Sequence, residues 1–273
     1  MMKSLSRPLL LVVIAAATAS LVAGDFREDC IVEWEPQNSR LTNDGKGVSL
    51  YLVSRSSGSR LRTRRTFIYG SVSSLVRLQT SSVGGSHDEI DFEFLGNRAG
   101  EPYTIHTNVF VGDTGGREVQ FKAWFDPAAD YHNYTISWRP WYVDGVPVRV
   151  FRNYKASSHG AAFPTSRPMY GYCSIWASES DWATQGGRVR TDWSGAPFVA
   201  RYRDIDLDVC NCSSSNGGCV TSGPAYGGAC RLSDSELGQM QSVQRDYVIY
   251  NYCLDDRRWK NGKKPVECGL PQY

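Results

Sequence analysis

Apolar and acidic side chains alternate strictly over residues 87–95, which read His-Asp-Glu-Ile-Asp-Phe-Glu-Phe-Leu. A period of two residues is that of a β-strand with two different faces. The acidic face would carry a row of carboxylates in steps of roughly 6.6 Å. The apolar face holds Ile90, Phe92 and Phe94, and the acidic face holds Glu89, Asp91 and Glu93. The segment therefore predicts a strand that separates an apolar core from an acidic surface.

The acidic row is more informative than an ordinary solvent-facing strand. Three like charges with no basic residue between them do not help folding, and Asp and Glu are depleted in strands. Two carboxylates four residues apart can lean to the separation of roughly 5–5.5 Å that retaining glycoside hydrolysis uses. Clustered carboxylates can also bind Mg²⁺ or Ca²⁺, although such ligands usually come from a flexible loop. We therefore expect catalysis with no metal and no cofactor.

The remaining pattern predicts an all-β protein with one helix near its end. Short alternating segments separated by turns run from Ile31 to about Tyr202, and Asp144-Gly145 is a two-residue hairpin signal. No stretch of helical period appears in this part, which favours a sandwich of antiparallel sheets. Residues 233–236 (Ser-Asp-Ser-Glu) form a capping box, followed by a helical apolar stripe of Leu237, Met240, Val243 and Tyr247.

The N-terminus predicts export. Lys3 and Arg7 precede an apolar run that ends near Ala23, as in a secretory signal peptide spanning residues 1–24. The run is short for a membrane span, so we expect a secreted protein with no membrane partner. The sequence has 30 basic and 28 acidic residues, and loss of residues 1–24 removes two basic and no acidic ones. A balance of 28 against 28 gives no electrostatic reason for a nucleic-acid partner.

Eight cysteines in an exported chain indicate disulfides. Paired C-x₂-C units, which would favour zinc, are missing from their spacing. Cys30 and Cys173 stand apart from the other six, which fall in the last quarter of the chain. Four of these six allow three pairings, between which the sequence does not choose: Cys210, Cys212, Cys219 and Cys230.

The stretch from His87 to Asn97 resembles the active-site strand of plant xyloglucan endotransglucosylase/hydrolases, a branch of glycoside hydrolase family 16. Further matching segments lie over most of the chain: His106-Thr-Asn-Val-Phe110, Trp124-Phe-Asp-Pro127, Tyr142-Val-Asp-Gly145, Asp181-Trp-Ala-Thr184, Thr191-Asp-Trp-Ser194 and Tyr250-Asn-Tyr-Cys253. The resemblance implies a curved jelly-roll of two antiparallel sheets with the acidic row on the concave face. It also implies a helical C-terminal extension that contains a Cys253–Cys268 disulfide. We expect residues 25–209 to form the catalytic domain and residues 210–273 the extension.

The resemblance implies a monomeric enzyme of the cell wall or apoplast. Such an enzyme cleaves xyloglucan with retention and passes the glycosyl group to another xyloglucan chain or oligosaccharide. Glu89 matches the nucleophile and Glu93 the general acid/base, with Asp91 between them. The short loop from Val111 to Gly116 is typical of members that favour transfer over hydrolysis. Sugar contacts are expected at His87, His106, Asn108, Arg117, Glu118, Trp176, Trp182, Gly187 and Arg258.

The chain departs from the family at three places. It is shorter after Leu78, where relatives carry a further strand, and it lacks a few residues after Pro140. The usual sequon after the active-site strand is missing, while sequons occur at Asn133 and Asn211. The two gaps leave two other functions open: a catalytically weak β-glucan-binding protein, or a plain endo-β-glucanase.

Overall fold

A computed structural model describes the fold of residues 24–75, 79–81, 87–96, 98, 100–138, 140–154, 160–164, 167–211, 232–260 and 262–272. The expected signal peptide, apart from its last residue Gly24, lies outside these residues, as do Cys212, Cys219, Cys230 and the side chains of Cys210 and Asn211. The pairing of those four cysteines and the second sequon therefore stay predictions.

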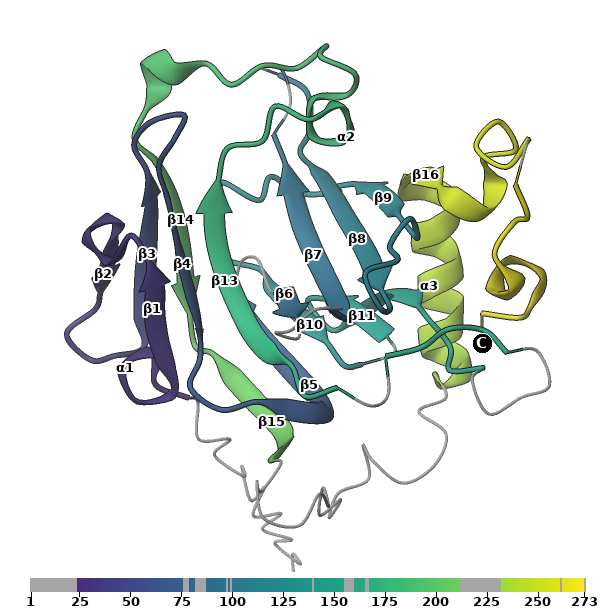
Figure 1. Cartoon of the computed structure of the whole chain (residues 1–273), viewed down its shortest axis with the longest axis horizontal. Coiled ribbons are helices and arrows are strands. Elements are labelled where there is room, and N and C mark those ends of the chain that lie inside the picture. Colours follow the sequence, from purple (N-terminus) through teal and green to yellow (C-terminus); the bar gives the residue numbers. More distant parts are fainter. Residues whose placement is uncertain are drawn as a thin grey trace, which may run out of the picture.

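The described strands form two packed layers, and every strand pair is antiparallel (Figure 1). One layer is an eight-stranded sheet: β1 (Cys30–Trp34), β4 (Gly58–Thr63), β13 (Tyr170–Trp176), β6 (Gln79–Ser81), β7 (Glu89–Leu95), β8 (Thr104–Phe110), β9 (Val119–Lys122) and β16 (Val248–Asn251). Against it lie a five-stranded and a three-stranded sheet. The five are β12 (Val146–Val150), β11 (Pro140–Val143), β10 (Asn133–Ile136), β5 (Phe67–Leu75) and β15 (Asp206–Asn211), and the three are β14 (Phe198–Arg203), β3 (Gly47–Leu52) and β2 (Ser39–Leu41). The predicted all-β sandwich of antiparallel sheets is confirmed.

Short helices connect or end the strands. The α-helices are α1 (Phe26–Asp29), α2 (Asp181–Thr184) and α3 (Asp234–Tyr247), and the 3₁₀-helices are η1 (Pro36–Asn38), η2 (Trp193–Gly195), η3 (Tyr252–Leu254) and η4 (Val266–Gly269). None of the helices in the described part of the chain is long and apolar enough to cross a membrane.

The core lies between the layers and fixes which face of β7 is apolar. Ile90 and Phe92 are each 1 % exposed and belong to this core. Tyr134 of β10 meets the rings of both Phe92 and Phe94 edge-on, at centroid distances of 5.6 and 4.6 Å. Because side chains alternate along a strand, this contact places the three acids on the opposite face of β7.

A short strand, β6, occupies the place of the predicted gap after Leu78. β6 has three residues, and it pairs with Tyr170–Tyr172 of β13 and with Glu89–Asp91 of β7. In the described residues it does not extend to the second half of β7, which begins at Phe92. Strands β7 and β13 thus pair through a short β6, and β11, which includes the position of the second predicted gap, is a four-residue strand.

The structure contains both local elements that short sequence motifs predicted, a hairpin turn and a helix cap. Asp144 and Gly145 join β11 to β12 with φ values of +50° and +76°, the positive values that a two-residue hairpin turn needs. At the start of α3, Ser233 Oγ accepts from Glu236 N, and Glu236 Oε2 accepts from Ser233 N at 2.8 Å. Both predictions are confirmed.

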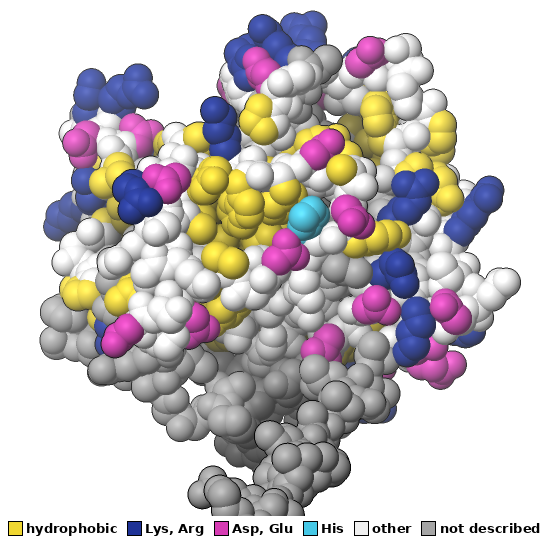
Figure 2. Space-filling view, turned by 180° about the vertical axis from the view of Figure 1, so that it is seen from behind, with side chains coloured by type: hydrophobic (Ala, Val, Ile, Leu, Met, Phe, Trp, Pro, Cys, Tyr) yellow, Lys and Arg dark blue, Asp and Glu magenta, His cyan; other side chains and the backbone are white. Residues whose placement is uncertain are grey.

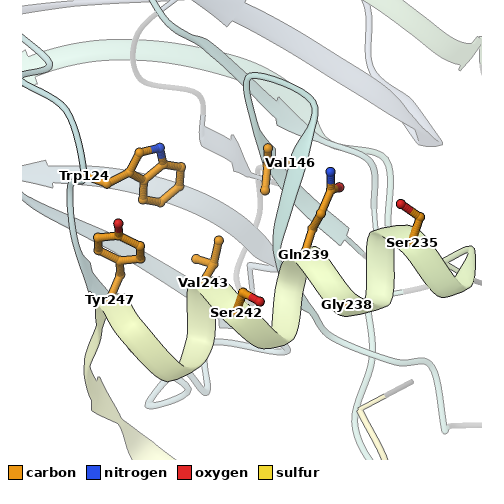
Figure 3. A pocket seen from close by; sticks show the side chains of 8 residues that line it. All are labelled: Trp124, Val146, Ser235, Gly238, Gln239, Ser242, Val243 and Tyr247. Carbon is orange, nitrogen blue, oxygen red and sulfur yellow. The ribbon is translucent and has the colours of Figure 1, made fainter.

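Helix α3 packs along β12 and the nearby ends of β9 and β16 (Figure 1). Met240 and Val243, from the predicted apolar stripe, are buried. A cavity of about 530 Å³ remains on the outer side of this joint, between α3 and the β11–β12 hairpin. Figure 3 shows the rings of Trp124 and Tyr247 at one end of it and Ser235 at the other.

The C-terminal residues are tied together after α3. Cys253 and Cys268 form the expected disulfide.

Cys30 and Cys173 are buried as free thiols on β1 and β13, and burial raises the pKa of the Cys30 thiol to about 12. These two thiols are therefore protonated and unreactive at ordinary pH.

Replacing Met240 tests how much of the stability comes from the docking of α3. Met240→Ala removes a fully buried side chain and should lower the free energy of unfolding by about 2–5 kcal/mol. The exposed Gln239→Ala on the same helix should change it by less than about 0.5 kcal/mol. Urea denaturation measures both values. Equal effects of the two variants would show that the helix does not depend on this contact.

Candidate active site

Strand β7 presents Glu89, Asp91 and Glu93 on the face turned away from the core. Pairing with β8 places Asp91 opposite Asn108 and Glu93 opposite His106. Residues directly opposite in an antiparallel pair share a face, so both side chains join the acidic row. The acids at the two ends of the row are more exposed than the central one: the side chains of Glu89 and Glu93 are 12 % and 18 % exposed, and Asp91 is 1 % exposed.

Asp91 is the most buried of the three acids and carries the largest electrostatic cost. Its burial, followed by the negative charges of Glu93 and Glu89, raises its pKa well above the usual value of 3.8. The main-chain N–H of Asn108 donates to Asp91 Oδ1 at 2.6 Å and opposes that rise. Because Oδ1 accepts this bond, the proton of the neutral form belongs on Oδ2. The acidic row therefore holds a proton at its centre.

A polar layer behind β7 and β8 fixes the backbone of both strands. Trp141 of β11 donates its Nε1–H to the carbonyl oxygen of Asp91 at 2.9 Å. The guanidinium of Arg149 lies 4.8 Å from the Trp141 ring centre. It donates to the carbonyl and hydroxyl oxygens of Thr107 at 2.9 and 2.8 Å and to the carbonyl of Arg117 at 2.7 Å. A buried cation is thus satisfied inside the sandwich, on the opposite side of the sheet from the acids.

His106 lies beside Glu93 as a neutral ring. Burial lowers the pKa of His106 to about 4. Gln120 Nε2 donates to His106 Nδ1 at 3.1 Å, which leaves the ring hydrogen on Nε2. This Nε2 is 3.7 Å from Glu93 Oε2. A neutral donor therefore faces the outermost carboxylate of the row.

A line of aromatic rings continues from this histidine across the open face of the sheet. The rings of His106 and Trp182 are 5.7 Å apart, and those of Trp182 and Trp176 are 6.1 Å apart. Trp182 stands on α2 with 43 % of its surface exposed. The two tryptophans line two cavities of about 500 and 580 Å³, one toward β4 and β13 with Arg60 and one toward β8 and β9 with Gln120. Trp182, beside His106, connects the Glu93 end of the acidic row with the second of these cavities.

His87 lies next to Glu89 at the other end of the row. Its Nε2 is 3.6 Å from Glu89 Oε2, and its side chain is 35 % exposed. The ring stacks on Phe110 with centroids 5.3 Å apart. The structure therefore places His87 and His106 at the two ends of the acidic row, and the sugar contacts expected of both histidines stay predictions.

Asn108 and Arg117 hold the loop that follows β8. The side-chain oxygen of Asn108 accepts from the main-chain nitrogens of Val109 and Arg117, each at 2.9 Å. Arg117 is 7 % exposed, and its Nε contacts Glu267 Oε1 at 2.6 Å. Its Nη1 donates to the carbonyl of Thr114 at 2.7 Å. Sugar contacts were predicted for Asn108 and Arg117, and in the structure their side chains bind the loop and the C-terminal segment.

Glu118 and Arg258 join the same loop to the C-terminal segment nearer the surface. Arg258 Nη1 is 2.5 Å from Glu118 Oε2 and 3.2 Å from the hydroxyl of Tyr250. Gly116 makes this approach feasible: its φ is +82°, and a Cβ at this position would lie 2.7 Å from Arg258 Nη2. Arg258 remains partly exposed, since a third of its side chain is accessible.

Gly187 lies in the turn after α2, with a φ of +83° that favours glycine. Its main-chain N–H donates to Thr184 Oγ1 at 3.0 Å. The residue is exposed on the loop that carries Trp182, so its position is consistent with the predicted sugar contact without testing it.

The sequence did not indicate four residues that shape this site. Trp141, Arg149 and Glu267 read as ordinary strand or surface residues, and Asp113 lies in a glycine-rich loop. Asp113 has a φ of +65°, which Asp tolerates better than most residues. An Asp in a glycine-rich loop is thus the one sequence signal that could have indicated this residue. Within the part of the chain that the structure describes, no group of three His, Cys, Asp or Glu side chains is arranged to hold a metal ion.

Sequence comparison identifies two family segments. Residues 26–195 match the model of glycosyl hydrolases family 16, and residues 221–268 match the xyloglucan endo-transglycosylase C-terminus. The chain is 40 % identical over 279 residues to "Probable xyloglucan endotransglucosylase/hydrolase protein 12" of Arabidopsis thaliana, an alignment that covers 96 % of this chain and 94 % of that protein. It is also 40 % identical to "Xyloglucan endotransglucosylase protein 7" of Diospyros kaki, covering 90 % and 98 %.

Comparison of folds agrees with this result. The structure titled "Apo Crh5 transglycosylase" superposes with a TM-score of 0.50 over 67 % of this chain and 85 % of that chain, at 20 % identity. This likeness concerns the fold alone.

Asp91→Asn tests the cost of the central acid. Asp91 has a raised pKa in the folded protein, so the folded form keeps its proton to a higher pH than the unfolded chain. Its contribution to the free energy of unfolding therefore falls as pH rises from about 3.8 toward the folded value. Urea denaturation across this range should show Asp91→Asn gaining stability relative to the unmodified protein. Parallel curves would contradict the raised pKa, and Asp126→Asn, on an exposed turn, controls for loss of one carboxylate.

Glu267→Gln tests the buried ion pair that anchors the loop. The variant leaves the Arg117 charge buried without its partner and should lower the free energy of unfolding by about 3–5 kcal/mol. The matched control is Asp256→Asn, which breaks the exposed pair with Lys264 and should cost less than about 1 kcal/mol. Chemical denaturation measures both, and similar small losses would argue against the loop being held by this contact.

Proposed function

The chain belongs to glycosyl hydrolase family 16, among the xyloglucan endotransglucosylase/hydrolases, and on that premise we propose that it acts on xyloglucan as a transglucosylase. It cleaves the β-1,4-glucan backbone with retention and passes the glycosyl group to a second xyloglucan chain or oligosaccharide. The observation that carries the proposal is the row of three carboxylates on one face of β7, beside two tryptophan-lined cavities.

The first half of the reaction uses the two outer acids. Glu89 attacks the anomeric carbon and forms a glycosyl ester, while the bond to the departing glucose oxygen breaks. Glu93 gives its proton to that oxygen. Asp91 holds a proton between them, and its strongest electrostatic neighbour is Glu93. Asp91 and Glu93 titrate together, so a proton can move from Asp91 to Glu93 within this pair.

In the second half Glu93 acts as a base. It takes the proton of an acceptor hydroxyl, the acceptor oxygen attacks the anomeric carbon, and Glu89 departs as a carboxylate. The neutral His106 at 3.7 Å offers Glu93 a hydrogen-bond donor without adding a positive charge. Two displacements on opposite sides of the sugar restore the original β configuration.

Transfer rather than hydrolysis is supported by the loop after β8. The loop turns tightly, because Val111 and Thr114 exchange main-chain hydrogen bonds of 3.0 and 3.2 Å. Arg117 and Arg258 then tie it to the C-terminal segment. A short, fixed loop leaves space for an acceptor sugar, and a bound acceptor has a far higher effective concentration than a transient one. The exposed part of Arg258 would contact the acceptor.

The proposed substrate is uncharged, and the charge pattern of the protein agrees with this. Figure 2 shows the face opposite to that of Figure 1, where basic and acidic side chains are interspersed around a hydrophobic area. Tryptophan rings such as Trp176 and Trp182 suit the apolar faces of pyranose rings, with polar side chains for the hydroxyls. We place the protein in the cell wall, where its proposed substrate occurs and where a disulfide such as Cys253–Cys268 persists.

One assay separates transfer from hydrolysis. The protein is incubated with xyloglucan and a labelled xyloglucan oligosaccharide, and both label incorporation and polymer size are followed. Incorporation with little shortening is expected. Shortening without incorporation would make the protein a hydrolase, and binding with neither change would make it a β-glucan-binding protein.

Glu89→Gln removes the proposed nucleophile and keeps the side-chain shape. Turnover of xyloglucan should fall by at least a thousandfold, about 4 kcal/mol in the barrier, because no glycosyl ester can form. Sugar affinity should stay within about threefold, as measured by calorimetry with a xyloglucan oligosaccharide. A variant that keeps its turnover would remove Glu89 from this role.

A further inference from the structure

Asp113, in the loop after β8, binds His87, which lies two residues before Glu89. Its Oδ1 accepts from the main-chain nitrogen of His87 at 2.8 Å and also contacts His87 Nδ1. In return the main-chain nitrogen of Asp113 donates to the carbonyl of His87 at 2.8 Å. These three contacts between two residues 26 positions apart make a specific joint between the loop and the start of β7. The backbone of Asp113 is left-handed, a conformation that few non-glycine residues adopt.

A second contact fixes the loop to the same strand end. Asp88 Oδ1 accepts from the main-chain nitrogen of Gly112 at 2.8 Å, one residue before Asp113. Asp88 is 3 % exposed, so the contact is shielded from water. The loop therefore holds its place relative to β7 by two neighbouring contacts.

The joint determines how the His87 ring is presented. A carboxylate accepts but does not donate, so Nδ1 carries a hydrogen toward Asp113. The ring also stacks on Phe110 at 5.3 Å with an interplanar angle of 29°. With Nδ1 and one ring face occupied, Nε2 is left facing Glu89 Oε2 at 3.6 Å. Asp113, His87 and Glu89 thus form a chain of carboxylate, imidazole and carboxylate, in which the ring attracts both acids when both of its nitrogens carry a hydrogen.

We propose that Asp113 is a positioning residue for the nucleophile, acting through His87. It holds Nε2 of His87 beside Oε2 of Glu89 and so orients the Glu89 carboxylate for its attack on the anomeric carbon. This inference rests on the proposed function in taking Glu89 as the nucleophile. The arrangement parallels the general rule that a reactive side chain is oriented by a second group, which a third group orients in turn.

Variants of Asp113 separate its charge from its part in the loop. Asp113→Asn keeps an oxygen for the main-chain nitrogen of His87 and a residue type that tolerates positive φ, but it loses the carboxylate. Because a hydrogen bond to a charged group is lost, kcat should fall about tenfold to a hundredfold. KM for xyloglucan should stay within about twofold, since Asp113 is placed behind His87 and away from the sugar.

A double-mutant cycle with His87→Gln decides whether Asp113 acts through the imidazole. In the His87→Gln background, Asp113→Asn should lower kcat by less than twofold, because the ring it orients is gone. Multiplicative losses, a change in KM alone, or an Asp113→Asn variant with unchanged kcat would each overturn the proposal. Asp192→Asn is the matched control, because Asp192 is also an exposed aspartate that accepts a main-chain N–H, that of Ser194 at 3.0 Å. Thermal unfolding confirms that each variant is folded.

The same variants are tested with a reagent that needs no xyloglucan. An epoxyalkyl β-glucoside alkylates the nucleophile: the carboxylate oxygen opens the epoxide to an ester, and the general acid protonates the released oxygen. Labelling of Glu89, followed by mass spectrometry, should slow by the same factor as kcat in Asp113→Asn. If the unmodified protein is labelled but does not turn over xyloglucan, the proposed substrate is wrong and the labelling rates still judge Asp113. Equal labelling rates in the unmodified protein and Asp113→Asn, or no labelling of Glu89, would overturn the role of Asp113.

Discussion

Three carboxylates share one face of a single strand, and most of the structure around them compensates for their mutual repulsion. Burial and the charges of Glu93 and Glu89 raise the pKa of Asp91 well above its usual value, which favours its neutral form. The N–H of Asn108 bonds one of its oxygens, and Trp141 bonds its carbonyl from behind the sheet. The buried Arg149 lies in the same layer as Trp141 and lowers the pKa of Asp91 slightly. A neutral Asp91 separates the charges of Glu89 and Glu93. Each of these two acids then acts as a separate group beside its own histidine.

The outer shell of the site depends on contacts between distant parts of the chain. Arg117 and Glu267 are 150 residues apart in sequence, and Arg258 and Glu118 are 140 apart. Both pairs connect the loop after β8 with the C-terminal segment, which the Cys253–Cys268 disulfide closes. The C-terminal segment therefore stabilises the loop beside the proposed acceptor side. A substitution at Arg258 or Glu267 would act on the site through this loop.

Short-range patterns predicted the local elements because their causes are local. The alternation in β7, the Asp144-Gly145 turn and the Ser233–Glu236 capping box each depend on neighbours within a few residues. The resemblance to the family predicted a gap after Leu78, yet it could not show that a three-residue β6 would pair with both neighbours. Pairing across a sheet depends on strands that are far away in the chain. The joint between Asp113 and His87 and the layer of Trp141 and Arg149 are of the same kind, so they became visible only in the fold.

In the proposed reaction, two carboxylates on one strand face act in succession at the same sugar carbon. The configuration of the linkage formed between donor and acceptor tests it most directly, because two displacements retain the original configuration and a single displacement inverts it. The product made from xyloglucan and an isotope-labelled oligosaccharide can be examined by ¹H–¹³C NMR at the new anomeric carbon. We expect a β linkage, and an α linkage would rule out two successive displacements.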